Sequence, residues 1–213
     1  MESMSSPAPG FLEIFLVLLI GIGPKIALVP FLQVTASLDA ATRRRVQWKM
    51  LGTAATAAVT LILLGELLRV IFHFTVAALS IAGGVILLVL AIRMVLDDAE
   101  SSRTLVDGKD PMQLAQVPLA VPYLLNPVGI VGLVTLSAEA QTLRDLAVAI
   151  VTLGAVLALD WAVFHWANRL GSTLNEERML VTEKLFGFLI AAVAVELILS
   201  GVTATGLAAR VMP

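Results

Sequence analysis

The sequence predicts an all-α integral membrane protein with six transmembrane helices, arranged as a 3+3 inverted repeat with broken first and fourth spans. Composition is the first indication, because 59% of the 213 residues are hydrophobic and only 14% are charged. A mean hydropathy of +0.96 excludes a soluble core of normal proportions. The other indications are six long apolar runs and two matching interruptions at proline. The length leaves room for about six spans with short loops, and hence for a single transmembrane domain over 1–213.

The first apolar run, 11 to 36, contains Gly23-Pro24-Lys25 near its middle. Written as one straight helix at about 1.5 Å per residue, it would be roughly 39 Å long, more than the roughly 30 Å hydrocarbon core. Pro24 lacks an N–H group and clashes with the preceding turn, and Gly23 adopts backbone angles that other residues avoid. We therefore predict a break here. Irregular backbone persists in lipid only where protein covers it or where it lines a watery cavity, so a cavity at mid-depth is also predicted.

The fourth span follows Pro118 and Pro122. Residues before proline avoid helical angles, so the start of this span is predicted to be irregular or re-entrant up to Asn126-Pro127. The polar stretch 97 to 113 precedes it and is interpreted as a linker between repeats. The five apolar runs that follow the first predict helices over 49 to 71, 75 to 96, 114 to 138, 143 to 167 and 185 to 207.

The two halves of the chain resemble each other. Gly23-Pro24 is followed 103 residues later by Asn126-Pro127, and Gly84 is followed at the same separation by Gly187. Each half has three spans, an odd number, so the second half enters the membrane in the opposite direction. The predicted units are 1–96 and 114–213, joined by 97–113. Inverted repeats with broken spans at matching positions are typical of secondary transporters. The alternative is independent use of glycine and proline, which are common in membrane helices.

Basic residues predict the orientation. Ten of them lie in the connections after the first, third and fifth spans, and only three lie on the other side of the membrane. The positive-inside rule therefore places these connections in the cytoplasm and both termini outside, in the cytoplasmic (inner) membrane. The ten are Arg43, Arg44, Arg45, Lys49, Arg93, Arg103, Lys109, Arg169, Arg178 and Lys184, and the three are Arg69, Arg144 and Arg210.

Charged residues inside the spans are the candidate functional groups. A cation at the centre of a membrane helix costs about 2.5 to 3.5 kcal/mol on insertion scales, so Lys25 needs an acidic partner or an anionic ligand. Asp160 lies deep in the fifth span and is the partner we expect for Lys25, with Glu196 as a second candidate. Either carboxylate could instead couple transport to protons. Glu66 and Arg69 predict a solvated pair three residues apart.

Other chemistry has little support in the sequence. Cysteine is absent, which excludes disulfides and thiolate metal sites. His73 and His165 lack the spacing of a metal site, and His165 beside Trp166 is typical of an interfacial position. The chain has no sequence motif of a metalloprotease, a serine hydrolase, a P-loop or a dinucleotide site, so neither an enzyme nor a cofactor is predicted. Nucleic acid is not implied as a partner.

Several stretches, taken together, resemble the MarC/SnatA group of six-span inner-membrane proteins. The resemblance implies transport of small neutral amino acids such as glycine and alanine, with coupling to protons. That family usually has Asn or Asp before its first proline and Gly-Pro-Gly at the second break, whereas here the asparagine is in the second half. The matching stretches begin at Gly23-Pro24, Ile81-Ala82-Gly83-Gly84, Val117-Pro118-Leu119-Ala120-Val121-Pro122, Asn126-Pro127-Val128-Gly129 and Gly187-Phe188-Leu189-Ile190.

The leading hypothesis is therefore a secondary transporter with alternating access. Its substrate site is predicted near mid-membrane, at Gly23, Pro24, Lys25, Asn126, Pro127 and Gly129. A fixed cation at Lys25 favours a solute that carries a carboxylate, with protons or sodium ions as the coupling ion. The alternatives are a membrane assembly or regulatory protein that moves no solute, and a protein that binds or moves anionic lipid headgroups. The sequence leaves open whether the protein forms a homo-oligomer.

Overall fold

The computed structural model describes residues 11–96, 110–170 and 176–206, and these ranges are helical apart from short connections. Five helices are long and apolar enough to cross a membrane, and counting one bent pair as a span gives six. The predicted all-helical, six-span architecture is confirmed. The predicted linker falls mostly on 97–109, outside the described residues. The helices are α1 (Phe11–Gly21), α2 (Pro24–Thr35), α3 (Ala40–Phe72), α4 (Val76–Leu96), α6 (Pro111–Leu114), η1 (Ala115–Leu124), α7 (Pro127–Glu139), α8 (Leu143–Leu170) and α9 (Glu176–Ala204).

Both predicted breaks are present, and they differ in shape. The first separates α1 from α2 at Ile22 and Gly23, within a run of 25 residues long enough to span the membrane. The second separates η1 from α7 and bends the chain by 69°. The irregular start of the fourth span is also confirmed, because Val117 (φ −134°, ψ 118°) and Val121 (φ −136°, ψ 122°), which precede the two prolines, have extended backbone angles.

Helix α3 begins nine residues before the predicted second span. The carboxylate of Asp39 accepts hydrogen bonds from the backbone N–H groups of Ala41 (3.0 Å) and Thr42 (3.2 Å) and so caps the helix. Hydrogen bonds from Thr42, those of its side chain first, lower the pKa of the Asp39 carboxylate. A run of apolar residues marks only the membrane-embedded part of a helix. The start of α3 was therefore not predicted, because its first turns are polar and basic.

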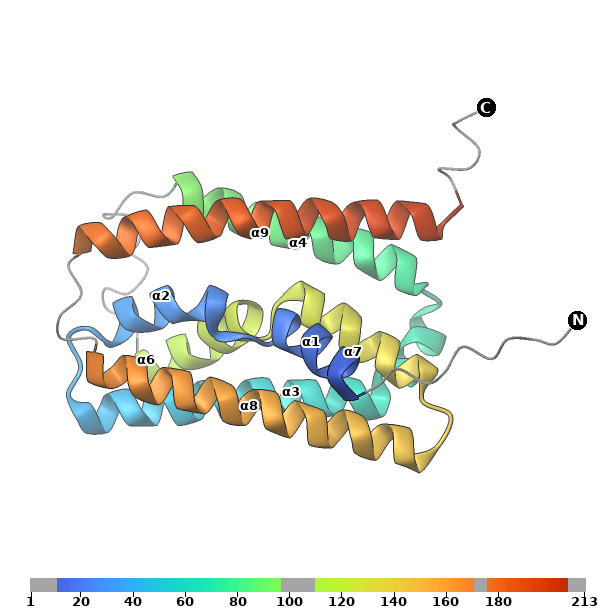
Figure 1. The fold of residues 1–213 in the computed structure, drawn as a ribbon, viewed down its shortest axis with the longest axis horizontal. Coiled ribbons are helices and arrows are strands. Elements are labelled where there is room, and N and C mark those ends of the chain that lie inside the picture. The colour runs from blue at the N-terminus through green and yellow to red at the C-terminus, as the bar shows by residue number, and fades with distance from the viewer. Residues whose placement is uncertain (1–10, 97–109, 171–175, 207–213) are drawn as a thin grey trace, which may run out of the picture.

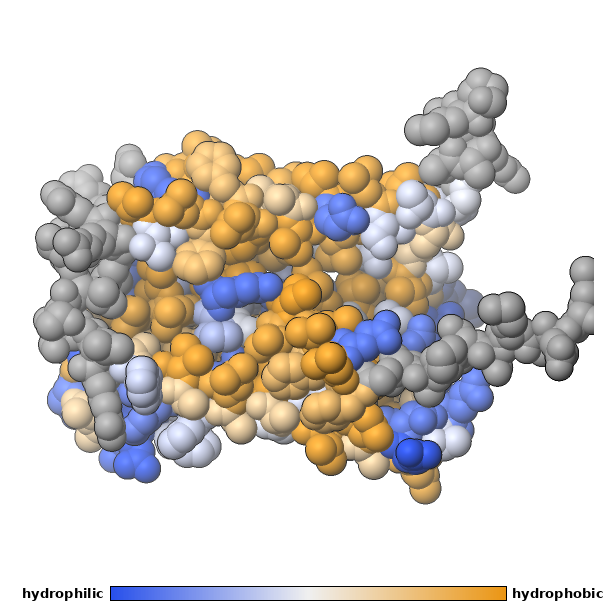
Figure 2. Space-filling view, in the orientation of Figure 1, coloured by the Kyte–Doolittle hydropathy of each residue, from blue (hydrophilic) through white to orange (hydrophobic). Residues whose placement is uncertain are grey.

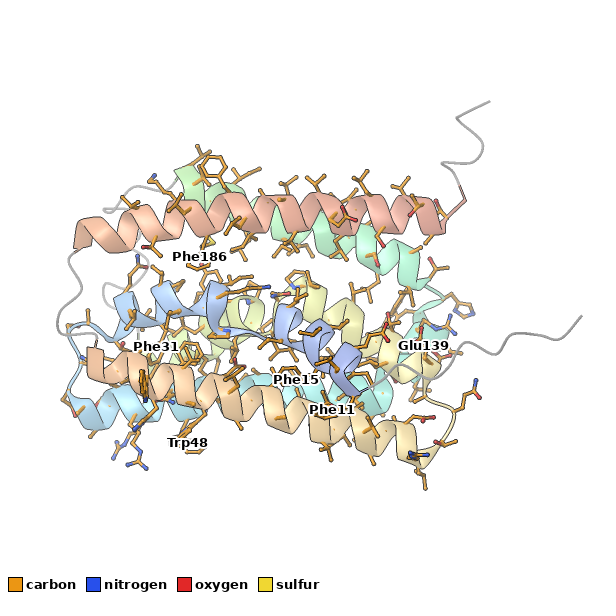
Figure 3. All side chains as sticks on the ribbon, in the orientation of Figure 1. Phe11, Phe15, Phe31, Trp48, Glu139 and Phe186 are labelled. Atoms are coloured by element: carbon orange, nitrogen blue, oxygen red, sulfur yellow. The ribbon has the colours of Figure 1, made fainter. Side chains whose placement is uncertain are left out.

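The broken spans lie between two pairs of long helices. Figure 1 shows α4 beside α9 on one side, α3 beside α8 on the other, and α1, α2, α6 and α7 between them. Phe31 of α2 and Phe164 of α8 pack edge to face, with ring centroids 5.0 Å apart. Figure 3 shows Phe31 between these two helices. The broken spans are therefore enclosed by protein on both sides, as irregular backbone in a membrane requires.

Helices α4 and α9 pack closely through two contacts, and each contact is related to the other by a shift of 103 residues. A Cβ atom added at Gly84 would lie 2.7 Å from the carbonyl oxygen of Ala194, and one added at Gly187 would lie 3.2 Å from that of Ala91. Gly187 is the equivalent of Gly84, and Ala194 is the equivalent of Ala91. Each contact thus has a counterpart with the two helices exchanged, which is the relation expected between inverted repeats. Glycine lets the two backbones approach closely.

Candidate functional site

The two breaks cross each other at a pair of glycines. A Cβ atom added at Gly21 would lie 2.2 Å from the Cα atom of Gly129, and one added at Gly129 would lie 2.4 Å from the carbonyl oxygen of Gly21. Real Cβ atoms essentially never come this close to another heavy atom. Only glycine at both positions therefore allows the end of α1 to touch the first turn of α7.

Asn126 joins the two breaks by hydrogen bonds. Pro24 has no N–H group, so the carbonyl of Ile20 lacks its usual helical donor four residues ahead. The side-chain amide of Asn126 donates to that carbonyl at 3.1 Å, and the backbone N–H of Asn126 donates to the carbonyl of Gly21 at 3.0 Å. The side-chain oxygen of Asn126 accepts from the N–H of Gly129 at 3.2 Å and caps α7. The second break therefore satisfies backbone groups that the first break leaves free.

The first turn of α2 has no equivalent cap. Gly23 occupies the capping position with an extended backbone (φ −97°, ψ 158°), and no side chain bonds to the helix end. A Cβ atom added at Gly23 would lie 2.2 Å from the carbonyl oxygen of Leu19, so a capping asparagine does not fit there. The free N–H groups of this turn carry the positive end of the helix dipole. The two breaks thus differ in chemistry, with α7 capped and α2 open.

A pocket of about 190 Å³, part of it open to the outside, lies beside the open end of α2. Lys25 and Asn126 line it, together with apolar side chains from α1, α2, α4, α7 and α9. Its enclosed part has room for about one water molecule. Figure 2 shows a small hydrophilic patch near the middle of a mostly apolar face, between α9 and the broken first span, which border this pocket.

Lys25 does not form the predicted pair with Asp160. Lys25 is half-buried in the pocket beside α4 and α9, whereas Asp160 is fully buried on α8, which packs against α1, α2 and α3. Glu196, the second candidate, is exposed on α9. Among the described residues Lys25 has no hydrogen-bond or ion-pair partner. Sequence position gave the depth of these groups but not the direction in which each helix turns them.

The remaining residues predicted for the site lie at the two breaks. Gly23 and Pro24 form the first break, and Pro127 begins α7 directly after Asn126. The side chain of Asn126 is 1% exposed and bonds to backbone, so its role in this conformation is to hold the two breaks together. Gly21 was not predicted, and the one sequence signal for it is its position two residues before Gly23.

Glu66 and Arg69 form the predicted ion pair on α3. The guanidinium donates to both carboxylate oxygens, at 2.6 and 2.7 Å, and both side chains are more than a third exposed. His165 stacks on Trp161 with ring centroids 5.1 Å apart. An exposed ion pair such as that of Glu66 and Arg69 contributes little to the stability of the folded protein.

Comparison with known proteins now decides the family. Residues 9–205 match the family described as MarC family integral membrane protein. The chain belongs to the MarC family. Its relatives include the UPF0056 membrane protein YvbG of Bacillus subtilis (strain 168), which is 26% identical over 176 residues, 80% of this chain and 83% of the relative. Another, YhcE of Escherichia coli (strain K12), is 21% identical over 199 residues, 91% of this chain and 92% of the relative.

Archaeal relatives in the MarC family extend the match. PYRAB13050 of Pyrococcus abyssi is 25% identical over 197 residues, which are 90% of this chain and 95% of the relative. The names of these relatives describe membrane proteins and give no substrate. No solved structure matches the chain. The family resemblance inferred from motifs is confirmed.

Proposed function

We propose that this MarC family protein is a secondary transporter of small solutes that carry a carboxylate, small amino acids among them. The solute binds in the pocket between the two breaks and crosses by alternating access. The observation that supports this is the presence of two positive groups in one pocket, the Lys25 ammonium and the uncapped first turn of α2. Neither has an acidic partner among the described residues.

Placing the Lys25 ammonium beside the positive end of α2 without a bound anion is energetically unfavourable. An ammonium near mid-membrane costs about 2.5 to 3.5 kcal/mol on insertion scales, and the positive end of a helix dipole adds repulsion. A carboxylate bound between the Lys25 ammonium and the free N–H groups of α2 would offset both. In this conformation the enclosed part of the pocket holds about one water molecule, so only a small solute is expected to fit once the pocket widens.

Solute entry requires movement, because the enclosed part of the pocket holds about one water molecule in this conformation. The pocket lies where the broken spans meet α4 and α9, and these two helices pack closely against each other. Rocking of the α4–α9 pair against the broken spans would enlarge it toward one side of the membrane at a time. Such motion around a fixed site is how inverted-repeat transporters work. We place the basic connections in the cytoplasm by the positive-inside rule.

Solute counterflow in proteoliposomes tests this function. Wild-type protein is expected to exchange one or more small amino acids out of a panel that also contains amines lacking a carboxylate. Lys25→Met keeps an unbranched side chain one atom shorter and removes its charge, so exchange should fall about ten- to a hundredfold, the equivalent of a hydrogen bond to a charged group. Lys49→Met, the same change at an exposed position on α3, should leave exchange unchanged.

Other results would support the alternatives. Wild-type protein that exchanges no member of the panel, while correctly folded, would support an assembly or regulatory role. Unchanged exchange in Lys25→Met would remove Lys25 from the site. Anionic lipid that copurifies with wild-type protein, and is lost in Lys25→Met, would support recognition of a lipid headgroup.

A further inference from the structure

Buried and half-buried polar side chains line the interface of α3 and α8 toward the end of the molecule that carries Arg43. Gln47 is 1% exposed, and its side-chain amide donates to the carbonyl of Trp161 at 3.0 Å. The Asn168 amide donates to the side-chain oxygen of Gln47 at 2.8 Å. The Arg43 guanidinium donates to the backbone carbonyl of Asn168 at 3.2 Å. We call Arg43, Asn168, Gln47 and Asp160 the polar file.

Unpartnered polar atoms are concentrated on this polar file. Among the described residues, four buried side-chain nitrogen or oxygen atoms have no hydrogen-bond partner. All four belong to the file: Nε of Arg43, Oδ1 of Asn168 and both carboxyl oxygens of Asp160. Buried polar atoms in folded proteins are nearly always bonded to protein or to ordered water. Their grouping on two neighbouring helices, α3 and α8, therefore indicates positions at which ordered water binds.

Asp160 lies at the inner end of the polar file. It is fully buried, one helical turn before Phe164, whose ring packs against Phe31 of α2. Along α8, Asp160 is about 12 Å from Asn168, at about 1.5 Å per residue. This stretch of α8 therefore lies next to α2, the half-helix whose first turn borders the solute pocket.

We propose that Asp160 is a proton-binding site, reached through water held along the polar file from the basic end of the molecule, and that its proton drives transport. A buried carboxyl group without protein donors needs either water donors or a proton of its own. The carboxylate takes one proton from water at the basic end and becomes a neutral acid. In the alternate conformation the acid returns that proton to water on the opposite side. The coupling to transport rests on the proposed function, whereas the proton site does not.

Among the described residues, Asp160 forms no ion pair with any charged side chain. The ion pair found there joins Glu66 and Arg69. A metal cation is a poorer fit than a proton, because those residues contain no group of three or more His, Cys, Asp or Glu side chains that could hold a metal. The titratable and charged side chains on the elements packed against Asp160, and on α8 itself, are Glu13 of α1, Lys25 of α2, Arg43, Arg44, Arg45, Lys49, Glu66 and Arg69 of α3, and Arg144, Asp145 and His165 of α8.

Infrared difference spectroscopy between acidic and alkaline pH tests the proton site without any substrate. Wild-type protein in lipid should give a carboxylic acid carbonyl band that is lost in Asp160→Asn and shifted in Asp160→Glu. His165→Gln, one turn further along the same helix, should keep the band. A wild-type difference spectrum identical to that of Asp160→Asn would overturn the proposal. Should Asp160→Asn fail to fold, the absence of a shifted band in folded Asp160→Glu would overturn it equally.

Transport measurements test the coupling separately. Uptake driven by a pH gradient should be lost in Asp160→Asn, and it should fall far more than solute counterflow, which needs no net proton movement. Gln47→Leu interrupts the polar file and should slow gradient-driven uptake without affecting counterflow. Full gradient-driven uptake by Asp160→Asn would overturn the coupling and leave the transporter proposal standing. Absent counterflow in the wild type would instead contradict the transporter proposal, and the infrared band would still decide the proton site.

Discussion

Gly129→Ala is expected to abolish solute exchange and to lower the stability of the folded protein. The added Cβ atom would lie 2.4 Å from the carbonyl oxygen of Gly21, which belongs to the backbone and cannot turn away. Inserting an additional methyl group into a well-packed contact lowers the free energy of unfolding by about 1–3 kcal/mol and sometimes more. Thermal unfolding in detergent should show a lower melting temperature, and counterflow in proteoliposomes should be lost.

Gly154→Ala is the matched control for this change. A Cβ atom at Gly154 of α8 meets nothing within 4 Å, so alanine fits there without displacing a neighbour. Alanine in a helix interior is more favourable than glycine by about 1 kcal/mol, so this variant should melt at or above the wild-type temperature and should exchange solute normally. Equal melting temperatures for the two variants would mean that the breaks do not touch at these glycines.

Asn126→Leu is expected to be as damaging as the glycine change, because one side chain serves both breaks. Its loss leaves the buried carbonyl of Ile20 unpaired, at about 1–3 kcal/mol, and removes the cap of α7, at about 0.5–2 kcal/mol. Asn126→Ser separates the two effects, because serine caps a helix but is too short to reach Ile20. Its melting temperature should fall between those of wild type and Asn126→Leu. Identical values for the serine and leucine variants would show that only the bridge to Ile20 matters.

The positions of the breaks could be predicted from the sequence because proline and glycine act locally. Pro24 removes a hydrogen-bond donor in any fold, and residues before proline, such as those before Pro118 and Pro122, disfavour helical angles. The separation of 103 between Gly84 and Gly187 likewise indicated their shared role before their contacts were known. These predictions needed no knowledge of which helices are neighbours.

The contacts inside the site could not be predicted in this way. The approach of Gly21 to Gly129 joins residues more than a hundred positions apart, and nothing near Gly21 marks its partner. Pairing Lys25 with Asp160 was wrong because depth alone does not bring two side chains together. Lys25 lies in the pocket beside α4 and α9, whereas Asp160 is buried on α8, which packs against α1, α2 and α3.

The central idea is that the crossed breaks border a site that water and solute can reach. The sequence contains no cysteine, so a single thiol can be placed without altering a background residue. Val128→Cys puts one in the pocket, and Ala58→Cys puts one in the fully buried packing of α3. The account predicts that a water-soluble methanethiosulfonate reagent modifies the thiol at position 128, that a transported amino acid slows this reaction, and that the thiol at position 58 stays inert. A thiol at position 128 as unreactive as that at position 58, with or without solute, would contradict the account.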